Sequence, residues 1–441
     1  MVILTDIILP VTLTFTGIFL TVKLKFVQVR CLFQGLKNMF SKKSGKGGIS
    51  PFRALMTSLA AQLGTGNIVG ASTAIIIGGP GAVFWMWVSA FFGMATAYAE
   101  AYLGVKTRKC RADGSFYGGA QYYITRAFSG KAAGVLSSLF SLFATAALGL
   151  TGVAVQSNSI AVALNEALSV PLWITGVALA VGAGIFIVKG PDTISSFAAK
   201  TVPPLAVIYI AGCIAVILFN VKNLPFAAGL IFRTALSPTA AAGGIAGESF
   251  RRALTQGIKK GLFTNEAGMG STVSAHAMSN TDSAHFQGTL GIAGVFIDTF
   301  LMLSITALAV ICALYKDEGV PDGNISGSLA VSAALSCVFT EKGAEIFVAL
   351  SILFFAFASI LGWSISGKVS AIYLSGEKSE KLYIASSLFF VFLGSVIPGG
   401  TVWALTDLFN TLMVLTNVPA LIRLAAEKEV TGRPTVKINK I

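Results

Sequence analysis

The stretch SLAAQLGTGNIVGASTAIIIGGPGA, residues 58–82, places glycines in the middle of an apolar run that is long enough to cross a membrane. The interruption combines glycines with polar residues: Gln62, Gly64, Thr65, Gly66, Asn67 and Gly70. Gly66 and Gly70 form a small-xxx-small pair, which lets membrane helices pack closely. Polar groups at mid-membrane depth need partners. Close packing and a binding site are therefore both compatible with this stretch taken alone.

The composition predicts an all-α membrane protein. Of the 441 residues, 54% are hydrophobic and 12% are charged, against roughly a quarter charged in soluble domains. Apolar stretches of about 18 residues or more, enough to span the hydrocarbon core, recur along the chain. The first has neither a basic flank before it nor a small-residue cleavage site after it, so we expect a retained helix rather than a signal peptide. We predict a single domain with eleven spans, at 3–22, 52–79, 82–105, 132–164, 171–189, 195–220, 241–280, 284–315, 343–374, 382–398 and 401–426.

The basic residues predict the orientation, since lysine and arginine are retained on the cytoplasmic side. With the N-terminus outside and the C-terminus inside, the cytoplasmic segments hold 24 of the 32 basic residues. Six of the others lie between Lys222 and Lys260, around the span 241–280. They could line a water-filled vestibule or belong to a re-entrant segment, or the boundary of this span is misplaced. Topology and contact with anionic lipid explain the net charge of +13 without a nucleic-acid partner.

A second interruption, GLFTNEAGMGSTVSAHA at residues 261–277, lies in the seventh predicted span. Without the N-terminal helix 3–22, ten spans divide into two sets of five, 52–220 and 241–426, followed by a cytoplasmic tail at 427–441. Because five is odd, the second set enters the membrane inverted relative to the first. Broken helices at equivalent places in inverted halves are the best sequence pointer to the binding site of a secondary transporter. The break frees N–H groups for an anion and C=O groups for a cation.

These two stretches also carry a family resemblance. GTGNIVGASTAIIIGGPGAVFWMW at 64–87 and GLFTNEAGMGS at 261–271 closely resemble the signatures of the bacterial and archaeal alanine or glycine:cation symporter family, and the resemblance extends over nearly the full chain. It implies a five-plus-five inverted repeat preceded by one extra helix. It also implies import of alanine or glycine with sodium, alone or with protons, across the bacterial or archaeal cell (inner) membrane. Sodium would be the coupling ion, and no other cofactor is implied.

The resemblance places the substrate at the two breaks. The carboxylate is expected to meet N–H groups around Thr65, Gly66 and Asn67, with the Asn67 side chain donating a further hydrogen bond. The ammonium is expected to face carbonyls near Phe263 and Thr264. Gln156 in VAVQSNSIA and Ser359 and Trp363 in FASILGW match positions of the family that face the site. The indole would cap a methyl-sized space and reject larger side chains by overlap. The implied substrate-binding residues are Thr65, Gly66, Asn67, Gln156, Phe263, Thr264, Gly268, Gly270, Ser359 and Trp363.

Two groups of oxygens are candidates for sodium. Sodium needs several oxygen ligands, and the sequence offers hydroxyls and carbonyls rather than a cage of carboxylates. One group is the carbonyls around Ala61 and Gly64 with Ser359 or Ser364 facing them. The other group combines Thr65, Asn67 and Thr264.

The chain departs from the family pattern at two places. After Trp363, the segment SISGK carries Ile365 and Ser366 in place of a tyrosine pair and Lys368 in place of a glutamate. In GGAQYYI, at 118–124, alanine and glutamine replace a typical Pro-Met pair. Both departures leave the exact substrate and the coupling open.

Glu266, Asp298 and Glu100 are acidic residues within the predicted spans, and each has two or more possible roles or partners. Glu266 follows the second break and either belongs to a cation or proton path or pairs with Lys259 or Lys260. Asp298 either takes part in coupling or hydrogen-bonds to a neighbouring helix. For Glu100, which ends its span near a basic loop, the plain expectation is a salt bridge with Lys106 or Arg108.

No catalytic motif accompanies the glycines. The sequence has neither a GxxxxGK[ST] loop nor a strand-led GxGxxG, and its two histidines, His276 and His285, suggest no metal site or hydrolytic triad. We therefore predict that the chain is not an enzyme. A channel, or an amino-acid permease with a different cation, remains the alternative to a sodium-coupled symporter.

Overall fold

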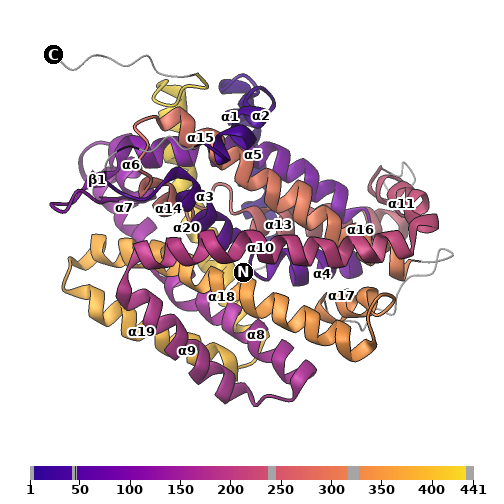
Figure 1. Cartoon of the computed structure of the whole chain (residues 1–441). Coiled ribbons are helices and arrows are strands. Elements are labelled where there is room, and N and C mark those ends of the chain that lie inside the picture. The colour runs from indigo at the N-terminus through magenta and orange to yellow at the C-terminus, as the bar shows by residue number, and fades with distance from the viewer. Residues whose placement is uncertain (1–3, 42–44, 46, 237–244, 316–326, 434–441) are drawn as a thin grey trace.

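The protein is nearly all helical (Figure 1). The computed structural model describes residues 4–41, 45, 47–236, 245–315 and 327–433. Its helices before the second break are η1 (Leu4–Ile8), α1 (Leu9–Lys23), α2 (Val27–Met39), α3 (Pro51–Gln62), η2 (Gly66–Gly70), α4 (Ala71–Gly78), α5 (Ala82–Thr107), α6 (Ala120–Ala127), α7 (Gly130–Ala144), η3 (Thr145–Gly152), α8 (Val153–Leu168), α9 (Leu172–Lys189), α10 (Pro191–Phe219), η4 (Val221–Asn223), α11 (Leu224–Leu236) and α13 (Ile245–Asn265). After it come α14 (Val273–Ala277), α15 (Ala284–Val295), η5 (Phe296–Leu303), α16 (Ser304–Leu314), α17 (Gly327–Leu335), α18 (Glu341–Ser375), α19 (Ser379–Val396) and α20 (Gly399–Ala426). A short antiparallel hairpin joins β1 (Lys109–Cys110) to β2 (Phe116–Tyr117).

Most predicted spans have a counterpart among these helices. Within the described residues, nine helices are long and apolar enough to cross a membrane, and a bent pair, α3 with η2 and α4, makes up to ten. The pair bends by 47° at the predicted interruption of 52–79. The predicted span 241–280 becomes α13 and α14, which are not among these ten candidates, so the total of eleven stays a prediction. Three parts of the predicted topology lie outside the described residues: residue 3 of the span 3–22, residues 241–244 of the span 241–280, and residues 434–441 of the tail.

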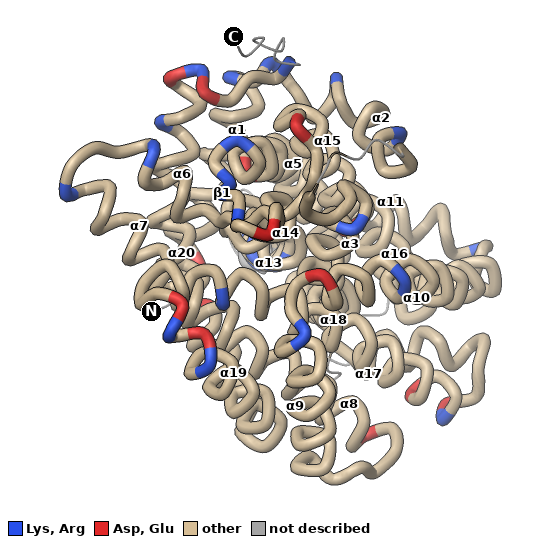
Figure 2. The backbone as a smooth tube through the Cα atoms, turned by 60° about the vertical axis from the view of Figure 1, so that its left-hand side comes forward, with Lys and Arg blue, Asp and Glu red and all other residues tan. Residues whose placement is uncertain are grey.

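The long helices form two packed groups. In one, α5 packs on α15 and α13, and α13 packs on α4; in the other, α8 packs on α18 and α19, and α9 packs on α19 (Figure 1). Small residues permit close approach: a Cβ on Gly394 of α19 would lie 2.3 Å from the carbonyl oxygen of Ala154 in α8. Charged residues are sparse along most helices and gather toward their ends and the connecting segments (Figure 2).

The two interrupted helices are joined by main-chain hydrogen bonds at one end. Ile49, just before α3, donates its N–H to the carbonyl oxygen of Met278, just after α14, at 3.0 Å. The N–H of Asn280 donates to the carbonyl oxygen of Ile49 at 2.7 Å. The start of α3 and the end of α14 are thus fixed to each other by a short parallel bridge.

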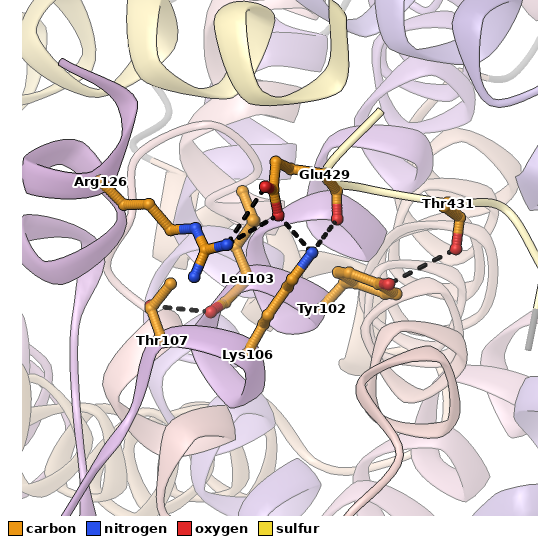
Figure 3. A network of polar contacts seen from close by, with 7 residues as sticks. All are labelled: Tyr102, Leu103, Lys106, Thr107, Arg126, Glu429 and Thr431. Carbon is orange, nitrogen blue, oxygen red and sulfur yellow. Dashed lines mark hydrogen bonds and ion pairs between the residues drawn. The ribbon is translucent and has the colours of Figure 1, made fainter. Parts of the chain in front are cut away.

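A polar network attaches the segment after α20 to the end of α5. Figure 3 shows the Glu429 carboxylate between Lys106 of α5 and Arg126 of α6. The Arg126 guanidinium lies 3.1 Å from both carboxylate oxygens, and Lys106 also donates to the Glu429 carbonyl oxygen at 2.7 Å. The Tyr98 hydroxyl donates to the carbonyl oxygen of Thr431 at 2.7 Å. The chain after α20 is therefore ordered against α5 as far as these contacts reach.

This network gives a pH-dependent contribution to stability. The hydrogen bond from Lys106 and the nearby Arg126 hold the pKa of Glu429 below its ordinary value of 4.5. A lowered pKa means that the contribution is fully present above that value and is lost as the pH falls through the folded-state pKa. We expect Glu429→Gln to cost no more than about 1 kcal/mol at neutral pH, because the pair is solvent-accessible. Thermal unfolding of both proteins across pH checks this.

The two unfolding curves should converge as the medium is acidified below the ordinary pKa of a glutamate. A difference between the wild type and Glu429→Gln that stays constant into strong acid would contradict the assignment. Added salt should shrink the difference at neutral pH, since exposed ion pairs are screened.

Candidate functional site

The first break lies against α8 and α18 on one side. Gly64 faces these helices: an added Cβ would lie 2.6 Å from the Ser359 hydroxyl oxygen and 2.9 Å from Nε2 of Gln156. The Thr65 N–H donates to Oε1 of Gln156 at 3.2 Å, and the Ser359 hydroxyl donates to the carbonyl oxygen of Ala60 at 2.7 Å. The structure thus brings Gly64, Thr65, Gln156 and Ser359 together, and it leaves no room for a side chain at Gly64.

The other side of the same break faces α13 and η5. A Cβ on Gly66 would lie 3.0 Å from the Thr264 methyl carbon. The Asn67 side chain donates from Nδ2 to Oδ1 of Asp298 at 2.6 Å. Asp298 therefore hydrogen-bonds to a neighbouring helix, one of the two roles weighed from the sequence. The break lies between the two helix groups, with a predicted site residue from each group beside it.

Several polar atoms at the breaks lack a partner. The Thr65 hydroxyl oxygen, Oδ1 of Asn67 and Oε1 of Gln62 are buried without a hydrogen bond to any described residue. Gln62 uses its other atom, Nε2, to donate to the carbonyl oxygen of Asn265 at the end of α13, at 3.0 Å. Buried polar atoms without partners are rare in proteins, and each calls for an explanation such as an ion or a ligand. Three acceptor oxygens are therefore available at the first break.

Glu100 occupies the second break. Its carboxylate accepts hydrogen bonds from the N–H groups of Gly268 and Gly270, at 3.1 and 2.8 Å, and its side chain is fully buried. Both glycines have positive φ, 90° and 77°, which turns their N–H groups toward one point. The expected salt bridge of Glu100 with Lys106 or Arg108 is wrong. The physical reason is that the broken helix supplies N–H donors closer to the carboxylate than either cation.

Gly268 and Gly270 do not lie with the other predicted site residues. A Cβ on Gly268 would meet the Leu13 side chain of α1 at 2.4 Å, and one on Gly270 would meet the Phe140 ring of α7 at 2.9 Å. Their N–H groups are already bonded to Glu100. The anion that the second break accepts in this structure is therefore a side chain of the protein.

Sequence reasoning missed two further members of this network. Asn417 of α20 donates from Nδ2 to a Glu100 carboxylate oxygen at 2.9 Å and to the carbonyl oxygen of Gly268 at 3.0 Å. The Tyr123 hydroxyl donates to Oδ1 of Asn417 at 2.5 Å. The sequence did offer a signal for Asn417, because an amide inside the apolar span 401–426 needs a polar partner at that depth.

Glu266 bonds to neither predicted lysine. The Trp363 indole N–H donates to its Oε1 at 2.7 Å, and the Ser271 hydroxyl donates to its Oε2 at 2.5 Å. The pairing with Lys259 or Lys260 is wrong, since Lys259 pairs instead with Asp6 and Asp407. Glu266 has a positive φ of 54°, so the turn that leaves α13 directs its side chain toward α18.

The remaining predicted residues lie along α3 and α18. The Trp363 ring packs against Gly152, where an added Cβ would lie 2.9 Å from a ring carbon. Ala61 packs against Gly362, one position before that tryptophan. The Ser364 hydroxyl donates to a carbonyl of its own helix at 2.7 Å. Among the sodium candidates, Ala61, Gly64 and Ser359 therefore line one helix contact, and the Ser364 hydroxyl is engaged within α18.

Ionic and aromatic contacts join α13 to α20 near the second break. Lys259 lies 3.2 Å from Asp407 and 2.7 Å from Asp6. The rings of Phe263 and Trp403 have centroids 5.3 Å apart. The cavity at this contact has a volume of about 20 Å³, which is about the size of one water. These contacts and the small cavity indicate that α13 packs closely against α20 on this side of the breaks.

The opposite side holds a larger cavity of about 850 Å³. It extends from charged residues at the junctions of α9 with α10 and of α18 with α19 to Ile365, two positions beyond Trp363 in α18. Its lining includes Tyr117, Tyr122, Lys189, Asp192, Lys368, Tyr373 and Glu380. Two residues of the unusual segment after Trp363, Ile365 and Lys368, thus line the cavity.

Solved structures share this arrangement of helices. The fold is similar to that of a manganese transporter from Eremococcus coleocola, a mutant form of which superimposes with a TM-score of 0.54 at 15% identity, over 88% of this chain and 81% of that one. This likeness concerns the fold alone. Together with the long apolar helices, it defines the class as a helical membrane protein with two interrupted helices at its buried centre.

The sequence comparisons place the chain within that class. The model of the sodium:alanine symporter family matches residues 1–431, and the chain belongs to this family. It is 38% identical over 418 residues to the sodium/alanine symporter AgcS of Methanococcus maripaludis, covering 93% of this chain and 90% of that protein. It is 35% identical to the probable sodium/glutamine symporter GlnT of Bacillus subtilis, covering 95% and 85%. The family resemblance read from the two breaks is thereby confirmed, and the protein is a transporter rather than an enzyme.

Proposed function

We propose that this protein is a secondary active transporter that imports alanine or glycine together with sodium, by alternating access across the cell membrane. The observation that carries the proposal is the first break, which lies between the two helix groups with unpartnered acceptor oxygens beside it. The family and the relative AgcS, whose name gives sodium and alanine, support the choice of solute and ion.

The proposed architecture has eleven spans, with helix 3–22 followed by the inverted repeats 52–220 and 241–426. Its support is the interruption of the first helix in each half, α3–α4 and α13–α14, and the bridge that joins these two helices. The N-terminus would lie outside and the C-terminal segment 427–441 in the cytoplasm. The hairpin of β1 and β2 would then be cytoplasmic, on the same side as the large cavity.

We assign the substrate to the first break. The carboxylate would meet backbone N–H groups at Thr65 to Asn67, and the ammonium would face carbonyls at Phe263 and Thr264. Gln156 and Ser359 would bound the site from the other helix group, and Trp363 would limit the side chain. Gly268 and Gly270 take no part in this assignment, because Glu100 already occupies their N–H groups.

The proposed state of the transporter is inward-facing. The cavity of about 850 Å³ lies on the proposed cytoplasmic side. On the other side, the Lys259–Asp407 ion pair and the contact of Phe263 with Trp403 close the path to the breaks. Alternating access would require these contacts to separate when the cavity closes.

Uptake into proteoliposomes tests the function. Labelled alanine should accumulate above equilibrium with an inward sodium gradient, and the accumulation should vanish when the gradient is collapsed. Equilibration that ignores the gradient would favour a channel, and a proton gradient that replaces sodium would favour a different cation. Competition by unlabelled glycine and glutamine settles the substrate range. Strong competition by glutamine would show that Trp363 does not limit the side chain as proposed.

A further inference from the structure

Asp298 is a buried acid without a cationic partner among the described residues. Its side chain is fully buried in η5, a π-helical stretch between α15 and α16. The carboxylate accepts hydrogen bonds from Asn67 Nδ2 at 2.6 Å and from the Thr299 hydroxyl at 2.9 Å. No lysine, arginine or histidine of the described residues forms an ion pair with it. Removing an unpaired carboxylate from water is costly, so this position favours neutralisation of the charge by a bound cation or a proton.

The oxygens beside Asp298 fit such a cation. Oδ1 of Asn67 and the Thr65 hydroxyl oxygen are buried acceptors without a partner, two positions apart in the first break. The segments η2, α13 and η5 pack on one another, which brings Thr264 to the same place. Carboxylate, amide and hydroxyl oxygens are ligands for hard cations such as sodium.

Glu100 and Glu266 are two other buried acids, and hydrogen-bond donors of the protein satisfy both of their carboxylates. Glu100 accepts from two N–H groups and an amide. Glu266 accepts from an indole N–H and a hydroxyl. Among the described residues, the side chains that donate to these two acids carry no buried acceptor oxygen without a partner. Asp298 differs because its amide partner, Asn67, also presents an acceptor oxygen without a partner. A cation beside the carboxylate would give that oxygen a partner.

We propose that Asp298 is the anionic ligand of a sodium site and that it couples sodium to substrate through Asn67. Without sodium, the carboxylate holds the Asn67 Nδ2 donor. When sodium binds to Asp298, the amide turns its oxygen to the cation and releases Nδ2 for the substrate carboxylate. This coupling rests on the proposed function, whereas the sodium site itself does not.

Coupling of this kind is reciprocal, and its size can be measured. If sodium raises alanine affinity by a factor, alanine raises sodium affinity by the same factor, typically about 5- to 150-fold. In purified protein, alanine binding measured in sodium chloride and in choline chloride of equal ionic strength should differ by a factor of that order. In Asp298→Asn the two affinities should be equal, because the neutral amide cannot attract sodium away from Asn67.

The sodium site can also be tested without substrate, by thermal unfolding in the presence and absence of sodium. A ligand that binds only the folded state raises its stability, so sodium should raise the unfolding temperature of the wild type above that in choline chloride. Asp298→Asn should lose this increase. The control is Glu345→Gln, which removes an acid of α18 that already pairs with Lys342 at 3.0 Å and should keep the increase. A wild type that is stabilised by sodium but binds neither alanine nor glycine would refute the proposed function and leave the sodium site standing.

If Asp298→Asn does not fold, Asp298→Glu keeps the charge and moves it by one methylene. It should raise the sodium concentration needed for half-maximal stabilisation by roughly tenfold, a loss of about 1.4 kcal/mol in sodium binding. Either variant responding to sodium as the wild type does would overturn the proposal.

Discussion

Asn67→Ala is expected to abolish sodium-driven uptake of alanine while the protein still reaches the membrane in folded form. The substitution removes the donor that bonds to Asp298 at 2.6 Å and the unpartnered oxygen beside it. In the proposed site, both the substrate carboxylate and the cation lose a contact at once. Losing a hydrogen bond to a charged group costs about 1.5–3 kcal/mol, so the two losses together reduce uptake by at least about a hundredfold. Uptake into proteoliposomes at matched protein content measures this.

Asn165→Ala is the matched control, because this asparagine is an exposed amide near the end of α8 that bonds only to a nearby backbone carbonyl. It should transport as the wild type does. Normal uptake by Asn67→Ala, with equal protein in the vesicles, would show that the substrate lies elsewhere.

Glu100→Ala is expected to destabilise the fold rather than act on transport alone. It leaves the N–H groups of Gly268 and Gly270 without an acceptor in a place that the substitution does not open to the surface. Each buried donor left unsatisfied costs about 1–3 kcal/mol, and the Asn417 amide loses one of its two acceptors as well. We expect a loss of about 3 kcal/mol or more, read as a lower unfolding temperature in detergent and less folded protein in the membrane.

Two further variants sharpen this result. Glu100→Gln keeps one oxygen acceptor and should lie between Glu100→Ala and the wild type. Glu166→Ala removes an exposed glutamate of α8 and should change stability by no more than about 0.5 kcal/mol. A Glu100→Ala protein that unfolds at the wild-type temperature would mean that water or another acceptor takes the place of the carboxylate.

The parts of the fold that follow from hydrophobicity were predictable. Long apolar runs gave most of the helices within a few residues, since spanning the membrane requires about 20 such residues. The two breaks were predictable because glycines and polar residues are costly inside an apolar helix unless the break has a purpose. The span 241–280 was harder, because α13 carries Arg251, Arg252, Lys259 and Lys260, and its composition resembles that of a surface helix.

The partners of the buried acids were not predictable from one sequence. Glu100 lies close in sequence to Lys106, and proximity along the chain favoured that pair. Two of its actual donors, the backbone N–H groups of Gly268 and Gly270, lie more than 160 positions away, and no residue type reveals a backbone group. Glu266 likewise accepts a hydrogen bond from a residue that is distant in the chain, Trp363. The sequence predicted only that this tryptophan caps the substrate pocket. Sequence patterns locate polar residues in a membrane, whereas tertiary packing decides which of them meet.

The bridge between Ile49 and Ser279 has a consequence for how related proteins can diverge. Its hydrogen bonds join main-chain atoms on both sides, so they survive almost any exchange of side chains at these positions. Related proteins can therefore exchange side chains around this bridge while the two interrupted helices stay joined by the same main-chain hydrogen bonds. Deletions that shift the register here would separate them, so we expect homologues to vary in residue type at this bridge far more than in length.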